Sequence, residues 1–205
     1  MIRILCVNLS SADETIYEQL YELASPERKA RADRYRLRED ALRCITADAL
    51  LRRVLGTDYA RVEKTLDGKP ILPHRPDFHF NLSHSGNWVA IAWGDANVGL
   101  DVESIDHKTN MAAVAQRFFA EEERQYVFAE ENDQNHRFFE VWTGKESYLK
   151  YLGTGLKKDL TAFSVLSPEP GLWLHRERLP DGSLLCLCTT EDAYSLELLD
   201  VQQLI

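Results

Sequence analysis

The chain has 205 residues, 44% of them hydrophobic and 28% charged, a balance typical of a globular protein that can bury a core. Its formal net charge of −9 argues against a general nucleic-acid-binding protein. Residues 1–9 are too short and too soon polar for a signal peptide or a membrane span. The four cysteines lack metal-ligand spacing, so we expect reduced thiols in a cytoplasmic protein with no membrane partner.

The first half is predicted to combine helices with short strands. Periodicity and turn residues predict a strand over 1–9, helices from 10–13 to 24, from 25 onward and over 38–55, and strands over 78–82, 88–93 and 98–103. Ser25 is the expected N-cap of the second helix, with Pro26 at its first position, and Gly56 is expected to end the third. Residues 83–86 are interpreted as a loop.

A hairpin turn at residues 94–97 is expected to pair the strands on either side of it. Regular pairing sets Trp93 opposite Val98 and Trp88 opposite Glu103. The loop at 83–86 would then lie near the acidic end of the last strand, beside Asp101 and Glu103.

The second half begins with helices and ends with strands. Helices are predicted over 111–119, 120–130 and 135–151, and strands over 162–165, 171–176, 184–189 and 194–198, with a turn at Asp181-Gly182. Helices combined with mainly antiparallel strands in both halves predict the α+β class.

Charge is distributed unevenly along the chain. Residues 28–38 hold six Lys or Arg and one Asp, and this basic segment suggests a local anionic ligand. From charge alone, however, a solvated helix face is the favoured interpretation.

Two short stretches carry the candidate chemistry. Asp101 and Glu103 share one face of the strand 98–103, and Trp142, Glu146 and Lys150 follow each other at i, i+4 and i+8 on one side of a helix. Taken singly, these residues fit an exposed strand face and a helical ion pair. Taken together, three carboxylates and a lysine suit a divalent cation beside phosphate oxygens.

The same stretches carry a family resemblance. Val-Gly-Leu-Asp-Val-Glu at 98–103 and Trp-Thr-Gly-Lys-Glu-Ser-Tyr-Leu-Lys at 142–150 resemble the paired signature of 4'-phosphopantetheinyl transferases of the Sfp type. The resemblance implies two α+β halves related by a pseudo-twofold axis, 1–99 and 100–205, with the active site in the cleft between them. The first half would bind the 3'-phosphate side of coenzyme A, and the second would hold the metal and the catalytic helix.

The resemblance also implies roles for individual residues. Asp101, Glu103 and Glu146 would hold Mg²⁺, with Mn²⁺ as the alternative. Glu146 would be the general base, and Lys150 would lie against the phosphates. Residues that match the family's contacts to coenzyme A are Arg28, Arg31, Arg43, Lys69, Pro70, Ser83, His84, Lys145 and Lys150.

The implied activity moves phosphopantetheine from coenzyme A to a serine of an apo carrier protein and releases adenosine 3',5'-bisphosphate. The carrier is expected to contact the helix at 111–119 and the basic segment at 28–38. One chain contains every expected site residue, so we expect a monomer. Two alternatives are a metal-dependent hydrolase of a nucleotide pyrophosphate such as coenzyme A and a non-catalytic module that binds carrier proteins.

Overall fold

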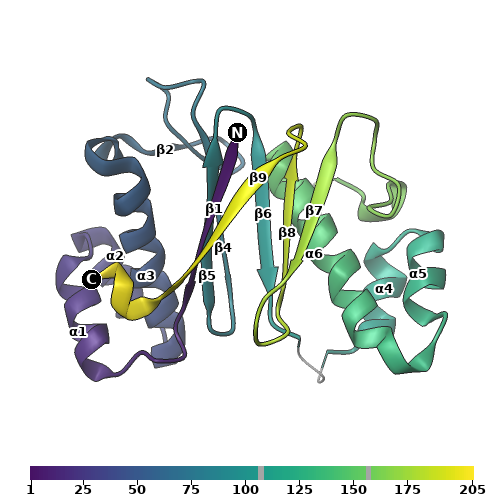
Figure 1. Cartoon of the computed structure of the whole chain (residues 1–205), viewed down its shortest axis with the longest axis horizontal. Coiled ribbons are helices and arrows are strands. Elements are labelled where there is room, and N and C mark those ends of the chain that lie inside the picture. Colours follow the sequence, from purple (N-terminus) through teal and green to yellow (C-terminus); the bar gives the residue numbers. More distant parts are fainter. Residues whose placement is uncertain (106–108, 156–157) are drawn as a thin grey trace.

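Two larger β-sheets lie side by side in the computed structural model, which describes residues 1–105, 109–155 and 158–205, and β2 and β3 form a small third sheet (Figure 1). The first sheet has the strand order β4-β5-β1-β9, and the second has the order β6-β8-β7. Helices α1 to α3 lie at one end of the molecule and α4 and α5 at the other (Figure 1). The strands are β1 (Ile2–Asn8), β2 (Glu63–Lys64), β3 (Pro70–Ile71), β4 (His79–Ser85), β5 (Trp88–Gly94), β6 (Val98–Glu103), β7 (Trp173–Arg178), β8 (Leu184–Thr189) and β9 (Tyr194–Asp200). The α-helices are α1 (Glu14–Leu23), α2 (Pro26–Ala32), α3 (Arg38–Leu55), α4 (Met111–Phe118), α5 (Glu121–Phe128) and α6 (Gln134–Leu152).

Strand β1 is buried on both of its faces. Leu5 and Val7 belong to the core under α1 and α3, whereas Ile4 and Cys6 belong to the core between the two sheets. Because successive side chains of a strand point to opposite faces, a continuous apolar run suits a strand covered on both sides. The predicted α+β class is confirmed.

The predicted helix boundaries around the basic segment are confirmed. The Oγ of Ser25 accepts a hydrogen bond from the backbone N–H of Arg28 at 3.2 Å, and Pro26 is the first residue of α2. Helix α3 ends at Gly56, whose φ of 54° is a conformation that glycine adopts without strain.

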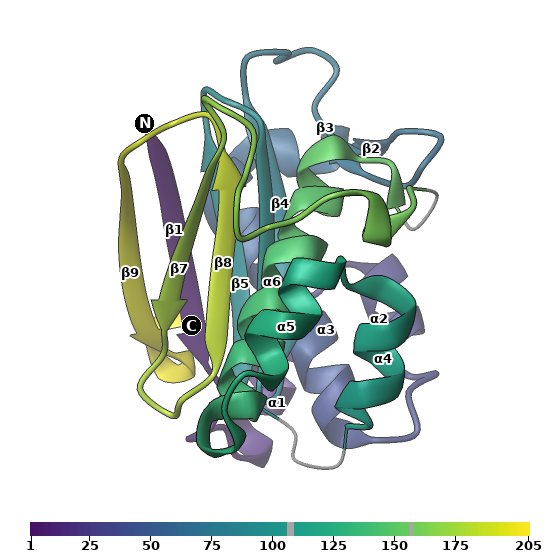
Figure 2. The ribbon, with the colours of Figure 1, turned by 90° about the vertical axis from the view of Figure 1, so that its right-hand side faces the viewer.

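Gly99 explains how closely the long helix α6 approaches strand β6. A Cβ atom on this residue would lie 1.9 Å from the carbonyl oxygen of Ser147 and 2.2 Å from the backbone N of Tyr151, so only glycine fits. Figure 2 shows α6 running alongside the strands, with α5 and α4 outside it. This contact brings the acidic residues of β6 beside the side chains of α6.

The expected hairpin between β5 and β6 is wrong. Strand β5 pairs with β4 on one edge and β1 on the other, so it has no free edge for β6. Trp93 lies opposite Phe80 and Arg3, and β6 instead pairs with β8 in the other sheet, where Val98 lies opposite Thr189.

Two further assignments differ from the prediction. Ser83, His84 and Ser85 are not a loop but the end of β4, paired in register with β5. Residues 162–165 are not a strand, because a 3₁₀ turn at Leu160–Ala162 precedes an extended segment that pairs with no sheet. The turn at Asp181-Gly182 is confirmed between the antiparallel strands β7 and β8, and Gly182 has a φ of 91°.

The C-terminal strand joins the sheet of the first half. Strand β9 runs parallel to β1, with Ile2 opposite Tyr194 and Asn8 opposite Asp200. By sequence β9 belongs to the expected second half, 100–205, yet it completes the sheet of the first half. The boundary expected at residues 99 and 100 therefore stays a prediction. None of the described helices is both long and apolar enough to cross a membrane.

Candidate functional site

Polar side chains of β4 join the first sheet to strand β6. Three backbone N–H groups of β6 and its end donate hydrogen bonds to them: Leu100 to Asn81 Oδ1 at 2.9 Å, Val102 to Ser83 Oγ at 3.2 Å and Ser104 to Ser85 Oγ at 3.1 Å. These side-chain bonds take the place of a strand ladder and satisfy one edge of β6. They also fix the register between the halves, so that Ser83 lies beside Asp101 and Ser85 beside Glu103.

The carboxylate of Asp101 is buried, with 3% of the residue exposed. Its Oδ1 accepts hydrogen bonds from Lys150 Nζ at 2.6 Å and from Ser83 Oγ at 2.9 Å. Its Oδ2 is buried and has no hydrogen-bond partner within the part of the chain that the structure describes. On the same face of β6, Glu103 Oε2 accepts a hydrogen bond from Ser85 Oγ at 2.7 Å.

The pKa values of Asp101, Glu103 and Glu146 are all raised, with burial as the largest cause. The charge of Asp101 raises the pKa of Glu103 further, and Asp101 and Glu103 both raise that of Glu146. Lys150 opposes the shift at all three carboxyl groups. Three carboxylates that repel one another in a partly dry site favour a bound cation.

A cavity of about 340 Å³ collects these acids and several cations between the two halves. Helices α2 and α3 form one side, and β4, β6 and α6 form the other. Its lining residues are Arg28, Arg31, Tyr35, Cys44, Ala47, Leu82, Ser83, His84, Asp101, Glu103, Glu146 and Lys150. The cavity therefore has a cationic side and an acidic side, which suits a phosphorylated molecule together with a metal ion.

A neighbouring cavity of about 280 Å³ shares Glu146 and Lys150 with the first one. Lys69 and Pro70 belong to its lining. The Nζ of Lys69 donates hydrogen bonds to the backbone oxygen of Val98 at 3.3 Å and to that of Tyr151 at 3.0 Å. Burial lowers the pKa of Lys69 to about 8.

Arg43 lies outside the lining of both cavities, next to the strand end that carries His84. Its Nη1 donates a hydrogen bond to the backbone oxygen of Gly86 at 2.7 Å, and it forms an ion pair with Asp40. Partial desolvation lowers the pKa of His84, and the charge of Arg43 lowers it further. The position of Arg43 thus supports the end of β4 and makes protonation of His84 less favourable.

Lys145 is not at either cavity, although it was predicted to contact coenzyme A. It is fully buried on another side of α6, with Nζ 2.7 Å from Glu123 Oε2. It also donates hydrogen bonds to the backbone oxygens of Leu160 at 2.7 Å and Phe163 at 2.9 Å. Successive residues of an α-helix are rotated by about 100°, so the side chain of Lys145 points about 100° away from that of its neighbour Glu146.

Several residues near the cavity were missed by sequence reasoning. Tyr35 and Cys44 line it, and Asp48 lies behind it, fully buried on α3. Asp48 shares the buried stripe of α3 with Ala41, Cys44 and Ile45, at helical spacing. An acid within an otherwise apolar stripe was the signal that could have identified Asp48 as a paired, buried charge.

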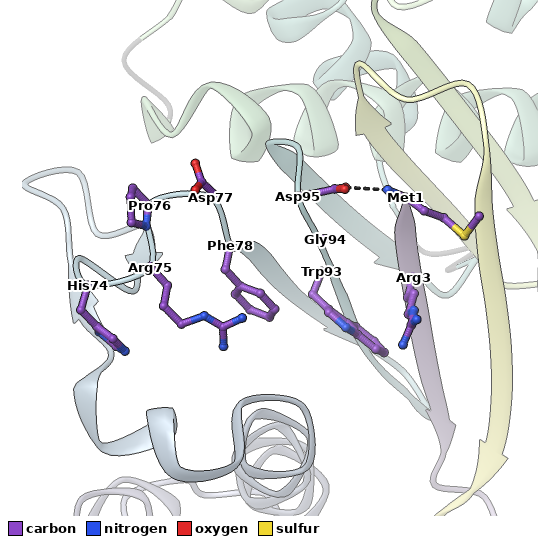
Figure 3. Close-up of a pocket in the computed structure, with 10 residues that line it drawn as sticks. All are labelled: Met1, Arg3, His74, Arg75, Pro76, Asp77, Phe78, Trp93, Gly94 and Asp95. Atoms are coloured by element: carbon purple, nitrogen blue, oxygen red, sulfur yellow. Dashed lines mark hydrogen bonds and ion pairs between the residues drawn. The ribbon is translucent and has the colours of Figure 1, made fainter.

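A different cavity lies at the edge of the first sheet and has a volume of about 590 Å³ (Figure 3). Figure 3 shows Arg75, Phe78 and Trp93 pointing into the space beside Arg3, and Asp95 reaching the N-terminal ammonium group, 2.5 Å away. Its lining contains none of the predicted site residues. We therefore take the cavity between the halves as the candidate site.

Comparisons with known proteins identify the family. Residues 97–196 match the family described as the 4'-phosphopantetheinyl transferase superfamily, and residues 11–95 match a family of N-terminal regions of 4'-phosphopantetheinyl transferases. The two successive matches fit an architecture of two halves.

Curated relatives cover most of the chain. The 4'-phosphopantetheinyl transferase psf-1 of Bacillus pumilus is 37% identical over 88% of this chain and 77% of the relative. The transferase Sfp of Bacillus subtilis is 35% identical over 84% of this chain and 79% of its own length, and Gsp of Aneurinibacillus migulanus is 32% identical over 80% and 71%. The chain therefore belongs to the 4'-phosphopantetheinyl transferase superfamily, and its activity is the transfer of phosphopantetheinyl groups.

Proposed function

We propose that the chain takes 4'-phosphopantetheine from coenzyme A and attaches it to a serine hydroxyl of an apo carrier protein. The observation that carries this proposal is the single cavity that Asp101, Glu103 and Glu146 share with the cations of α2 and with His84 of β4. Coenzyme A offers a pyrophosphate for the acidic, metal-binding side and a 3'-phosphate for the cationic side. The released product is adenosine 3',5'-bisphosphate.

Arg28, Arg31 and His84 are the proposed contacts to the 3'-phosphate. Two guanidinium groups offer forked donors for phosphate oxygens, and an imidazole donates one further hydrogen bond. An anion at this place would raise the lowered pKa of His84, so the histidine gains its charge as the nucleotide binds.

The three carboxylates fit a hard divalent cation such as Mg²⁺. The support is the orphaned Oδ2 of Asp101 and the mutual repulsion that raises the pKa values of Glu103 and Glu146. When bound, Mg²⁺ or Mn²⁺ supplies charge neutralisation at the pyrophosphate oxygens.

The acids need rearrangement before they can hold a metal ion. Among the described residues, no three His, Cys, Asp or Glu side chains are arranged to do so as they stand. Lys150 Nζ lies 2.6 Å from Asp101 Oδ1 and supplies a positive charge there. We infer that Lys150 leaves Asp101 and turns toward the phosphates when the donor binds.

Glu146 and Lys150 are the proposed catalytic residues. The carboxylate of Glu146 lies in the cavity beside Lys150, and it takes the proton of the serine hydroxyl. The serine oxygen forms a bond to the β-phosphorus of coenzyme A as the bond to the bridging oxygen breaks. Lys150 stabilises the negative charge on the departing adenosine 3',5'-bisphosphate.

The acceptor is a carrier protein, and carrier domains are expected to be acidic. Because this chain is itself acidic, recognition has to be local. We propose that α4 and the basic segment at residues 28–38 form the contact surface. Arg28, Arg31 and Tyr35 of the basic segment line the cavity, and α4 packs against α6, the helix of Glu146 and Lys150.

The compartment is proposed to be the cytoplasm. All four cysteines, Cys6, Cys44, Cys186 and Cys188, are buried and unpaired. Free thiols in a protein are maintained by a reducing compartment.

Intact mass spectrometry of an apo carrier protein tests the proposal. The carrier is incubated with this protein, coenzyme A and Mg²⁺, and its mass should increase by one phosphopantetheine group. A carrier variant without its serine is the control. Cleavage of coenzyme A without any change in the carrier would favour the hydrolase, and binding without either reaction would favour the non-catalytic module.

A further inference from the structure

Asp48 forms a buried cluster behind the cationic side of the cavity. Its residue is 0% exposed, and three groups donate hydrogen bonds to its two carboxylate oxygens. The donors are the backbone N–H of Ser25 at 3.1 Å from Oδ2, Arg52 Nε at 3.2 Å from Oδ2, and the hydroxyl of Tyr59 to Oδ1. Arg28 adds an ion pair, with its Nε 3.2 Å from Oδ1. The carboxylate thus links α3 to the start of α2 and to the 3₁₀ turn at Gly56–Arg61.

A buried carboxylate is costly unless its charge is paired and its oxygens are bonded. Asp48 meets that requirement with two guanidinium groups and two hydrogen bonds. Its neighbours on the buried stripe of α3, Ala41, Cys44 and Ile45, are apolar or nearly so. Since an apolar residue would fill this position without any desolvation cost, the charge of Asp48 calls for an explanation beyond packing.

The connection to Arg28 supplies that explanation. Arg28 lines the cavity, and only 25% of its side chain is exposed. Asp48 forms an ion pair with the inner Nε, while the Oγ of Ser25 accepts a hydrogen bond from the backbone N–H of Arg28. The outer Nη atoms of Arg28 donate no hydrogen bond to the residues that the structure describes.

A guanidinium group is planar, so the ion pair that holds Nε 3.2 Å from Asp48 restricts the direction of both outer nitrogens. Ser25 in turn fixes the backbone of the same residue at the first turn of α2. The side chain of Arg28 therefore loses most of its freedom before any ligand arrives, which lowers the entropic cost of binding an anion there.

We propose that Asp48 is a positioning residue that orients Arg28 for the 3'-phosphate of the nucleotide. This inference rests on the proposed function, in which Arg28 contacts that phosphate. Asp48 touches no substrate, and its role is to hold the fork of Arg28 toward the cavity. The arrangement places a carboxylate, a guanidinium and a phosphate in sequence, in the way that a carboxylate bonded to a metal-binding histidine orients its ring.

Binding of two nucleotides measures this role without any transfer reaction. Calorimetry compares adenosine 3',5'-bisphosphate, which has the phosphate in question, with adenosine 5'-monophosphate, which lacks it. Wild type should prefer the bisphosphate. Asp48→Asn keeps the shape but removes the charge, and it should reduce that preference about tenfold, with little change in the affinity for the monophosphate.

The double variant with Arg28→Ala separates positioning from general stability. Once Arg28 is removed, Asp48→Asn should cause no further loss of preference, because its effect acts through that side chain. Tyr59→Phe removes another donor to the same carboxylate but leaves the Arg28 pair, so it should keep the wild-type preference. Asp48→Glu retains the charge and moves it by one methylene, and it should lose the preference even if Asp48→Asn does not fold.

Three results would overturn the inference. They are an unchanged preference in Asp48→Asn or Asp48→Glu, an equal loss of affinity for both nucleotides, and a further loss of preference from Asp48→Asn in the Arg28→Ala background. A wild type that prefers the bisphosphate but transfers nothing to a carrier would contradict the proposed function and leave the role of Asp48 standing.

Discussion

Hydroxyl groups of strand β4 hold the metal-binding carboxylates proposed for β6. Ser83 Oγ donates a hydrogen bond to Asp101 and accepts one from the backbone N–H of Val102. Ser85 Oγ likewise donates to Glu103 and accepts from the backbone N–H of Ser104. A serine that both donates and accepts has a fixed hydroxyl direction. These pairs keep each carboxylate oriented while its charge is repelled by its neighbour.

Glu103→Gln should separate metal binding from folding. The amide retains a hydrogen-bonding oxygen for Ser85 but removes a charge that repels Asp101. We expect turnover at limiting Mg²⁺ to fall about a hundredfold, since a metal contact supplies several kcal/mol to charge stabilisation. The melting temperature without metal should stay the same or rise. Glu130→Gln, at a surface ion pair with Arg137, is the matched control, and near-normal turnover of Glu103→Gln at limiting Mg²⁺ would exclude Glu103 as a ligand.

The raised pKa of Glu146 predicts how stability depends on pH. Its carboxyl group holds a proton more tightly in the folded protein than in the unfolded chain, where the ordinary pKa is 4.5. The folded protein therefore binds more protons in the range just above pH 4.5, and its stability falls as the pH rises through that range up to the folded pKa. Melting curves of the metal-free protein should show this fall.

Two comparisons identify the source of that pH dependence. Glu146→Gln should flatten the fall because the titrating group is gone. Added Mg²⁺ should also flatten it, since a cation stabilises the ionised carboxylates. A metal-free wild type whose melting temperature rises steadily from pH 4.5 to 7 would contradict the assigned direction of the shift.

At the scale of elements, local signals predicted helices and distant contacts decided the sheets. The N-cap at Ser25, the stop at Gly56 and the spacing of Glu146 and Lys150 depend on neighbouring residues, and the structure agrees with them. One edge of β5 pairs with β1, which lies about eighty residues earlier in the sequence. The turn between β5 and β6 alone could not show that this edge is already occupied.

Polar residues gave another wrong assignment, the loop at 83–86. Ser83 and Ser85 resemble loop residues by composition, yet they belong to a strand because their side chains bond to the backbone of β6. The candidate acids were predictable because motif spacing specifies a shared face. The pairing of Asp48 with Arg28 was not predictable, since it depends on how α2 packs against α3.

Gly99→Ala tests the contact between β6 and α6. The added methyl group would lie 1.9 Å from a backbone oxygen of α6, so the helix has to move away from the strand. We expect a loss of about 3 kcal/mol in the free energy of unfolding by urea, together with a larger Mg²⁺ requirement, because Glu146 moves relative to Asp101. Gly171→Ala is the control: it has open space but a φ of 85°, and it should cost about 1 kcal/mol. Equal effects of the two variants would show that close packing at Gly99 is unimportant.

At the scale of the molecule, the two halves share one core. Ile4 and Trp88 of the first half pack with Leu100 and Leu185 of the second in the same buried cluster. Strand β9 then returns to pair with β1, so the chain leaves the first half and comes back to it. Each half also has a buried cluster of its own, under α1 and α3 in the first and around α6 in the second, and the shared cluster joins the two.

A single unfolding transition of a monomer is therefore expected. Trp88 and Trp93 belong to the first half and Trp142 and Trp173 to the second, so the double variants Trp142→Phe/Trp173→Phe and Trp88→Phe/Trp93→Phe report by fluorescence on one half each. With allowance for the stability change of each variant, both reporters should follow the circular dichroism signal through one urea transition, because burial of the shared cluster couples the halves. Sedimentation at assay concentration should give a mass near 23.5 kDa, since one chain supplies both sides of the cavity. Two separate transitions would contradict a shared core, and a specific activity that falls on dilution, together with a larger sedimenting species, would show that the active form is an oligomer.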